Sequence, residues 1–68
     1  MKNSYIIQAI YKTGIFYVFF DSSNIPSFVS NKSQATVFDS QVLGRGWISY
    51  AESKAPNYKY SLITYQAI

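Results

Sequence analysis

The chain is 68 residues long, contains no cysteine and no histidine, and carries a net charge of +3 at pH 7. A chain of this length forms one domain, residues 1–68, close to the lower limit at which a hydrophobic core supports a fold. The missing residue types exclude disulfide bonds, the usual zinc sites, histidine bases, and Ser-His-Asp or Cys-His centres. We therefore expect neither catalysis nor a metal or other cofactor.

The first predicted elements form a β-hairpin. Residues 5–11 and 15–20 are rich in β-branched and aromatic side chains and are separated only by Lys12-Thr13-Gly14. We place Gly14 in the left-handed region of a three-residue loop with a bulge, so that Tyr11 lies opposite Ile15. A two-residue loop at Thr13-Gly14 is the alternative, and it shifts the pairing by one residue. With Tyr11 opposite Ile15, one hairpin face carries Tyr5, Ile7, Ala9, Tyr11, Ile15, Tyr17 and Phe19, and the other carries Ile6, Gln8, Ile10, Phe16, Val18 and Phe20.

The middle of the chain alternates turns with short extended pieces. Residues 21–27 form a cluster of turn formers, and Pro26 cannot donate a sheet hydrogen bond, so a connecting loop is expected there. Phe28 and Val29 begin a short strand, residues 31–34 form another turn, and residues 36–38 form a second extended piece.

A single amphipathic helix follows. Asp39 or Ser40 offers an N-cap, and the helix ends before Pro56. Because glycine weakens a helix, the alternative is a helix that begins only after Gly46. The residues at helical spacing are Leu43, Trp47, Tyr50, Ala51 and Lys54. Residues 57–66 form the final strand, with Tyr58, Tyr60 and Leu62 on one face and Lys59, Ser61, Ile63 and Tyr65 on the other.

These elements predict an α+β fold, in which a small antiparallel sheet of three to four strands, with the hairpin first, is covered by one helix on one face in the order ββ(β)αβ. The second sheet face meets water or a partner. Because tyrosine is amphipathic and loses little entropy at an interface, we expect the tyrosines of this face and nearby cations to bind a partner. The predicted partner-binding residues are Tyr5, Tyr11, Lys12, Tyr17, Arg45, Lys59 and Tyr65.

Residues 13–20 resemble the aromatic RNP1 strand of RNA-recognition motifs and the related strand of cold-shock domains. Gly14, Tyr17, Val18 and Phe20 match that pattern, whereas Thr13, Ile15 and Phe16 depart from it. The resemblance implies nucleic-acid binding on an aromatic sheet face, which we keep as the alternative function.

The arrangement of the whole chain resembles small phage and prophage proteins of the anti-CRISPR and host-takeover type. The likeness consists of an N-terminal Tyr-Ile-Ile-Gln strand and hairpin, residues 35–40 leading into a helix with Ala51 near its end, and a terminal strand. It implies a protein of the bacterial cytoplasm that inhibits a host defence complex, such as a CRISPR effector, by direct protein contact. A third possibility is a homo-oligomer, such as a homodimer, that buries its own exposed sheet face or pairs its edge strands across a two-fold axis. No membrane partner is expected, since the apolar run at residues 15–20 is too short to cross a bilayer.

Overall fold

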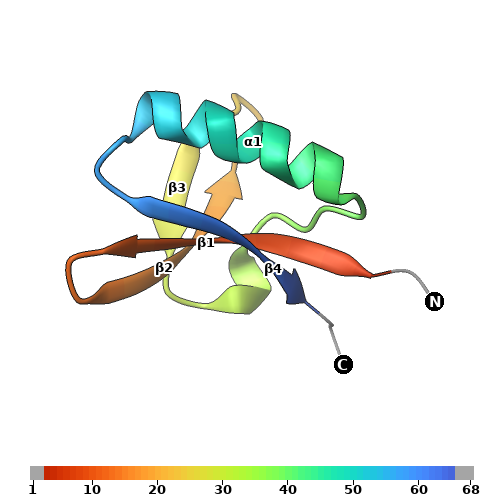
Figure 1. Ribbon diagram of the computed structural model, residues 1–68, viewed down its shortest axis with the longest axis horizontal. Coiled ribbons are helices and arrows are strands. Elements are labelled where there is room, and N and C mark those ends of the chain that lie inside the picture. Colours follow the sequence, from red (N-terminus) through yellow and green to blue (C-terminus); the bar gives the residue numbers. More distant parts are fainter. Residues whose placement is uncertain (1–2, 66–68) are drawn as a thin grey trace.

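The computed structural model describes residues 3–65. The strands form one antiparallel sheet in the order β3-β2-β1-β4, and the single α-helix of the described residues lies across one face (Figure 1). The elements are β1 (Ser4–Tyr11), β2 (Gly14–Phe20), β3 (Pro26–Val29), the 3-10 helix η1 (Lys32–Gln34), α1 (Gln41–Lys54) and β4 (Lys59–Tyr65). The predicted α+β class and the helix before the last strand are confirmed. Gln66, expected in the last strand, lies outside the described residues.

The hairpin loop differs from both predicted forms. Tyr11 pairs with Gly14, so the loop contains only Lys12 and Thr13. Lys12 adopts a positive φ of 54°, whereas no glycine does so in residues 3–65. Gly14 is instead placed where a β-carbon would lie 2.7 Å from the ring of Phe16. The three-residue loop and the loop at Thr13-Gly14 are therefore both wrong.

The observed register changes which side chains share a face. Ile10 pairs with Ile15 and Gln8 with Tyr17, so each β2 side chain lies on the opposite face from the one predicted relative to β1. The face toward α1 carries the odd-numbered residues of β1 and the even-numbered residues of the other strands. We call the opposite face the open sheet face; it carries Ser4, Gln8, Ile10, Ile15, Tyr17, Phe19, Ser27, Val29, Lys59, Ser61, Ile63 and Tyr65. Ile6 also points to this side, but it is fully buried.

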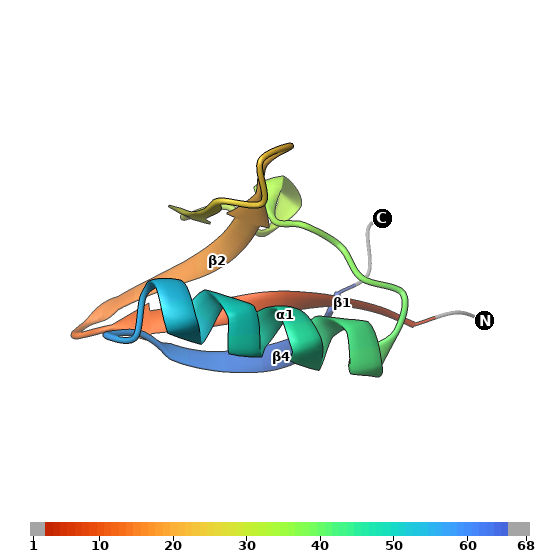
Figure 2. The ribbon, with the colours of Figure 1, turned by 90° about the horizontal axis from the view of Figure 1, so that it is seen from above.

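The sheet is split at its centre because β2 turns away from β1 (Figure 2). Residues 36–38 lie between the two diverging strands. Phe38 exchanges backbone hydrogen bonds of 2.7 and 2.8 Å with Tyr5, and the Thr36 amide donates to the Val18 carbonyl at 3.1 Å. The Phe20 amide donates to Thr36 Oγ1 at 2.8 Å. Residues 36–38, predicted as a short extended piece, thus form a single β-bridge, between Phe38 and Tyr5. Their hydrogen bonds satisfy backbone groups of β1 and β2 that the two strands, being separated here, cannot satisfy for each other.

The core lies between α1 and the sheet and is built from small aliphatic residues and large rings. Ile7, Ala9 and Val18 are fully buried, and Phe38 is 6% exposed. Rings from both ends of the sheet meet above the small Ala9 and Val18, where Phe28 of β3 stacks on Tyr58 with centroids 3.9 Å apart. Tyr58 directly precedes β4, and β3 and β4 are opposite edges of the sheet, so this contact requires the sheet to curl around the core.

The helix begins and ends at capping residues. Ser40 is the N-cap, and its hydroxyl accepts a hydrogen bond from the Leu43 amide at 3.4 Å. The helix ends at Lys54, before Pro56, as predicted. It includes both glycines, so the alternative start after Gly46 is wrong. Gly44 is buried, and a β-carbon there would lie 2.5 Å from Cδ1 of Leu62, whereas a β-carbon at Gly46 would meet nothing within 4 Å.

The two helical glycines are expected to respond oppositely to alanine. Gly44→Ala forces Leu62 aside and should lower the free energy of unfolding by about 1–2 kcal/mol, even after the gain in helix propensity. Gly46→Ala meets no atom and should raise it by about 1 kcal/mol. Urea unfolding followed by circular dichroism measures both, and equal shifts would contradict the close helix–sheet approach at Gly44.

Tyr60 of β4 forms hydrogen bonds with the C-terminal end of α1. Its hydroxyl donates to the Ala55 carbonyl at 2.6 Å and lies 3.4 Å from the Ala51 carbonyl. Burial, together with the nearby Tyr58 and Glu52, raises the pKa of Tyr60 to about 12.

The raised pKa predicts an alkaline loss of stability. An unfolded tyrosine ionises near pH 10, so between about 10 and 12 the unfolded chain releases a proton that the folded chain keeps. The contribution of Tyr60 is therefore complete below pH 10 and is lost as the pH rises through 12. Unfolding free energies of the wild type and Tyr60→Phe should converge across this window. A constant difference between them would show that the hydroxyl is not held in its neutral form.

Candidate functional site

The residues predicted to bind a partner do not form one surface. Tyr17, Lys59 and Tyr65 share the open sheet face, because their strand partners Gln8, Ile10 and Ser4 all point the same way. Lys32 adds a second cation there, with Nζ 5.9 Å from the centre of the Tyr17 ring. This face also exposes apolar side chains, among them Ile15 and Phe19.

The other predicted residues lie elsewhere. Tyr5 is on the α1 side, where its hydroxyl accepts a hydrogen bond from Gln41 Nε2 at 3.2 Å. Tyr11 is also on that side and packs 5.2 Å from Tyr58, with Lys12 above its ring in the hairpin loop. Arg45 is exposed on α1. The predicted common face for Tyr5, Tyr11 and Tyr17 is therefore wrong, because it depended on the shifted hairpin register.

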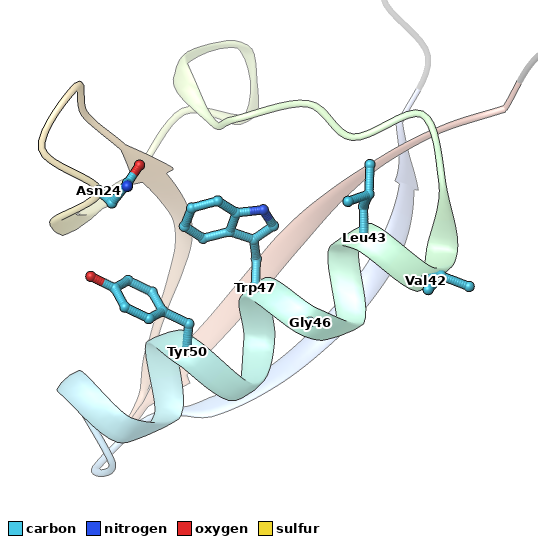
Figure 3. A pocket seen from close by; sticks show the side chains of 6 residues that line it. All are labelled: Asn24, Val42, Leu43, Gly46, Trp47 and Tyr50. Atoms are coloured by element: carbon cyan, nitrogen blue, oxygen red, sulfur yellow. The ribbon is translucent and has the colours of Figure 1, made fainter.

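An apolar hollow lies between α1 and the β2–β3 loop (Figure 3). We call it the α1 groove. Its volume is about 340 Å³. Two apolar residues of the groove are highly exposed to solvent, Val42 at 81% and Leu43 at 53%. The groove is lined by Asn24, Val42, Leu43, Gly46, Trp47 and Tyr50.

Trp47 forms the floor of the groove and packs against aromatic rings of the core side. Its ring lies 4.6 Å from Phe20 and 6.4 Å from Phe38, which belong to the core and the aromatic shell packed on it. Tyr50 meets Trp47 edge to face at 5.5 Å and also approaches Phe20 at 6.2 Å. The apolar floor is thus held in place by the same packing that holds α1 on the sheet.

The opposite wall of the groove is a tightly closed turn. Asp21 Oδ1 accepts hydrogen bonds from the Ser23 amide at 2.9 Å and the Ile25 amide at 3.0 Å. The Asn24 amide donates to the Asp21 carbonyl at 2.9 Å, and Asn24 has a positive φ of 61°. Asparagine tolerates this conformation better than most residues. The turn presents the Asn24 side chain across from Trp47 and Tyr50 (Figure 3).

The hollow continues past Tyr50 toward the end of the helix. A second cavity of about 430 Å³ lies between Phe28, Tyr50 and Lys54. Lys54 Nζ stands 5.6 Å from the centre of the Tyr50 ring. Asp21 already accepts two backbone hydrogen bonds, and Glu52 is two positions from Tyr50, so it faces away from the groove. Lys54 therefore supplies a positive charge at this end of the hollow.

The α1 groove was not predicted from the sequence, although the sequence contains a signal for it. Val42, Gly46 and Tyr50 recur at four-residue spacing, and Leu43 and Trp47 form a second such row beside them. Together these rows make the apolar side of α1 wider than one core-facing stripe requires. Helix periodicity could not predict that the β2–β3 loop lies opposite these rows and completes the groove.

The groove is suited to holding apolar side chains. Trp47 and Tyr50 offer ring faces and edges, and Asn24 and the Tyr50 hydroxyl add polar groups at one end. In residues 3–65, no group of three metal-binding side chains assembles, and no buried side-chain polar atom lacks a hydrogen-bond partner. The same part of the chain contains no helix of sufficient length and hydrophobicity to cross a bilayer. Comparisons with protein-family models, curated proteins and solved structures gave no match to this chain.

Proposed function

We propose that this chain is a non-enzymatic binding protein whose α1 groove receives an apolar segment of another protein. The observation that carries the proposal is Gly46. A glycine inside a helix costs about 1 kcal/mol relative to alanine. No neighbouring atom requires it, since a β-carbon at Gly46 would meet nothing within 4 Å. Its effect is to keep the helix surface bare between Val42, Trp47 and Tyr50, where a partner backbone can approach closely.

The shape and charge of the groove favour a particular kind of partner. A volume of about 340 Å³ accepts one or two large side chains rather than a whole domain. Aromatic anchors on a rigid floor are typical of residues that dominate binding energy in protein interfaces. Because Lys54 lines the second cavity beyond Tyr50, the segment that fits best carries apolar side chains followed by a neutral or acidic residue.

The biological setting is part of the same proposal. The arrangement of elements resembles phage inhibitors of the anti-CRISPR and host-takeover type, which act by occluding a site on a host complex. We propose that this protein acts in the bacterial cytoplasm and that its partner is a subunit of a host defence complex.

A matched pair of variants tests the proposal. Gly46→Gln places a helix-favouring side chain in the groove, whereas Ser49→Gln places the same side chain on an exposed part of α1 outside the groove lining. Proteins retained from host lysate by the immobilised wild type should be lost with Gly46→Gln and kept with Ser49→Gln. Circular dichroism checks that both variants are folded. Retention of the same proteins by Gly46→Gln would overturn the proposal.

A second candidate function is single-stranded nucleic-acid binding on the open sheet face. It is favoured by the Lys32–Tyr17 contact and by Lys59 on the same face. Asp21, Asp39 and Glu52 all lie outside the strands, so none of the strand side chains on this face is acidic. The logarithm of the affinity for a random oligonucleotide should then fall linearly with the logarithm of the salt concentration, with a slope of about 0.7 per phosphate contact. Tyr17→Ala should reduce this affinity. Affinity that does not change with salt would exclude this candidate.

A further inference from the structure

The two edges of the sheet differ in how they are protected. The β3 edge is four residues long and begins with Pro26, which cannot donate a hydrogen bond to an added strand. The β4 edge is seven residues long, and each of its residues pairs with β1 on the inner side. β4 is an edge strand, and its outer side faces none of the described segments in Figure 2.

Natural edge strands are usually kept from pairing by proline, bulges, charged side chains such as lysine, or short length. β4 has one of these devices, Lys59, and it lies at the end of the strand. Its sequence, Lys-Tyr-Ser-Leu-Ile-Thr-Tyr, contains no proline and has its single charge at the first position. Its register with β1 runs without a break from Lys59 to Tyr65. The strand therefore presents a regular row of backbone donors and acceptors on its outer side.

We propose that β4 pairs with β4 of a second copy of this chain, antiparallel and with Leu62 opposite Leu62, to join the two sheets into one. This register uses all seven residues of each strand. It sets Ser61 opposite Ile63 and Lys59 opposite Tyr65. Odd-numbered residues meet odd-numbered residues, so each open sheet face continues into the other and both helices lie on the same side.

The position of the single charged residue of β4, Lys59, is compatible with pairing to a second copy. The two Lys59 residues lie at opposite ends of the paired strands, about 20 Å apart at 3.4 Å per residue. That separation exceeds the Debye length of about 8 Å at physiological salt, so their repulsion is screened. Each lysine instead faces a tyrosine ring across the interface, an arrangement that favours a cation–π contact.

Pairing through β4 leaves the α1 groove open. The groove lies between α1 and the β2–β3 loop, and β2 and β3 are the two strands farthest from β4 in the sheet order. A dimer would thus present two grooves, and it could form whether or not the groove binds a partner. The tests of the two proposals can therefore fail independently.

Disulfide trapping tests the register, because the natural chain contains no cysteine. Equal amounts of the Ser61→Cys chain and the Ile63→Cys chain are mixed and mildly oxidised. In the proposed dimer, position 61 of one chain lies about 5 Å from position 63 of the other, within disulfide reach, whereas the two copies of position 61 are more widely separated. We expect mixed 61–63 dimers to exceed 61–61 dimers several-fold beyond the ratio of random pairing. The ratio of random pairing, or an excess of 61–61 dimers, would overturn the register.

Sedimentation of the wild-type chain gives a second measurement that requires no substitution. The apparent mass should rise from one copy toward two as concentration increases into the millimolar range. A mass of one copy throughout that range would overturn the proposal, whatever the folding of the cysteine variants.

Discussion

Ile7→Ala is expected to lower the free energy of unfolding by about 4 kcal/mol, close to complete loss of the fold. Ile7 is fully buried in the core beneath α1. A 68-residue domain has a total stability of roughly 3–10 kcal/mol at 0.05–0.15 kcal/mol per residue, so this loss is a large part of the whole. Urea unfolding followed by circular dichroism measures the change.

Ile15→Ala is the matched control for Ile7→Ala. The shifted hairpin register would place both isoleucines on one face, whereas the structure leaves Ile15 52% exposed on the open sheet face. Its truncation should cost less than about 1 kcal/mol. Similar losses for the two variants would contradict the observed pairing of β1 with β2.

Trp47→Ala is expected to cost about 3 kcal/mol, the lower end of the range for a large aromatic, because the ring is only partly buried. The substitution removes ring contacts to Phe20 and Phe38 and leaves a space between α1 and the curled sheet. Val42→Ala on the same helix should change stability by less than about 0.5 kcal/mol, since Val42 is 81% exposed. Chemical unfolding followed by far-ultraviolet circular dichroism gives both values. An unchanged midpoint for Trp47→Ala would show that this ring does not hold the helix on the sheet.

Several parts of the fold follow from local sequence signals. Turn residues and β-branched runs are sufficient to predict the hairpin, a loop after β2 and the turn at η1. The predicted loop over residues 21–27 is too long, because β3 already begins at Pro26. The hydroxyl of Ser40 and the position of Pro56 indicate both ends of the helix. In β4 and the residue before it, the alternation of Tyr58, Tyr60 and Leu62 with Lys59, Ser61 and Ile63 predicts the two faces, because only one of them is mainly apolar.

The hairpin register could not be predicted because both faces of the hairpin are apolar. Ile6 and Ile7 are adjacent and both fully buried, and β2 is a nearly continuous run of large apolar side chains. A strand pattern that is apolar on both sides does not indicate which set faces the core. The loop also departed from the expected chemistry, because Lys12 adopts the positive φ that was expected at Gly14.

The α1 groove depends on tertiary structure that no local pattern contains. Gly44 and Gly46 look alike in sequence, yet one is needed for the approach of Leu62 and the other leaves the helix surface bare. Asn24 becomes part of the site only because the curl of the sheet carries the β2–β3 loop opposite α1. The predicted common face for the tyrosines is wrong because the observed hairpin register places Tyr17 on the opposite side of the sheet from Tyr5 and Tyr11.

Site-directed photo-crosslinking in the host cell tests most directly whether the α1 groove is the binding surface. A benzoylphenylalanine placed at Val42 in the groove is compared with one at Phe19 on the open sheet face; both side chains are exposed, so the added ring can be accommodated at either position. We expect a crosslinked host protein from position 42 and none from position 19. A host protein crosslinked from position 19 but not from position 42 would contradict the account.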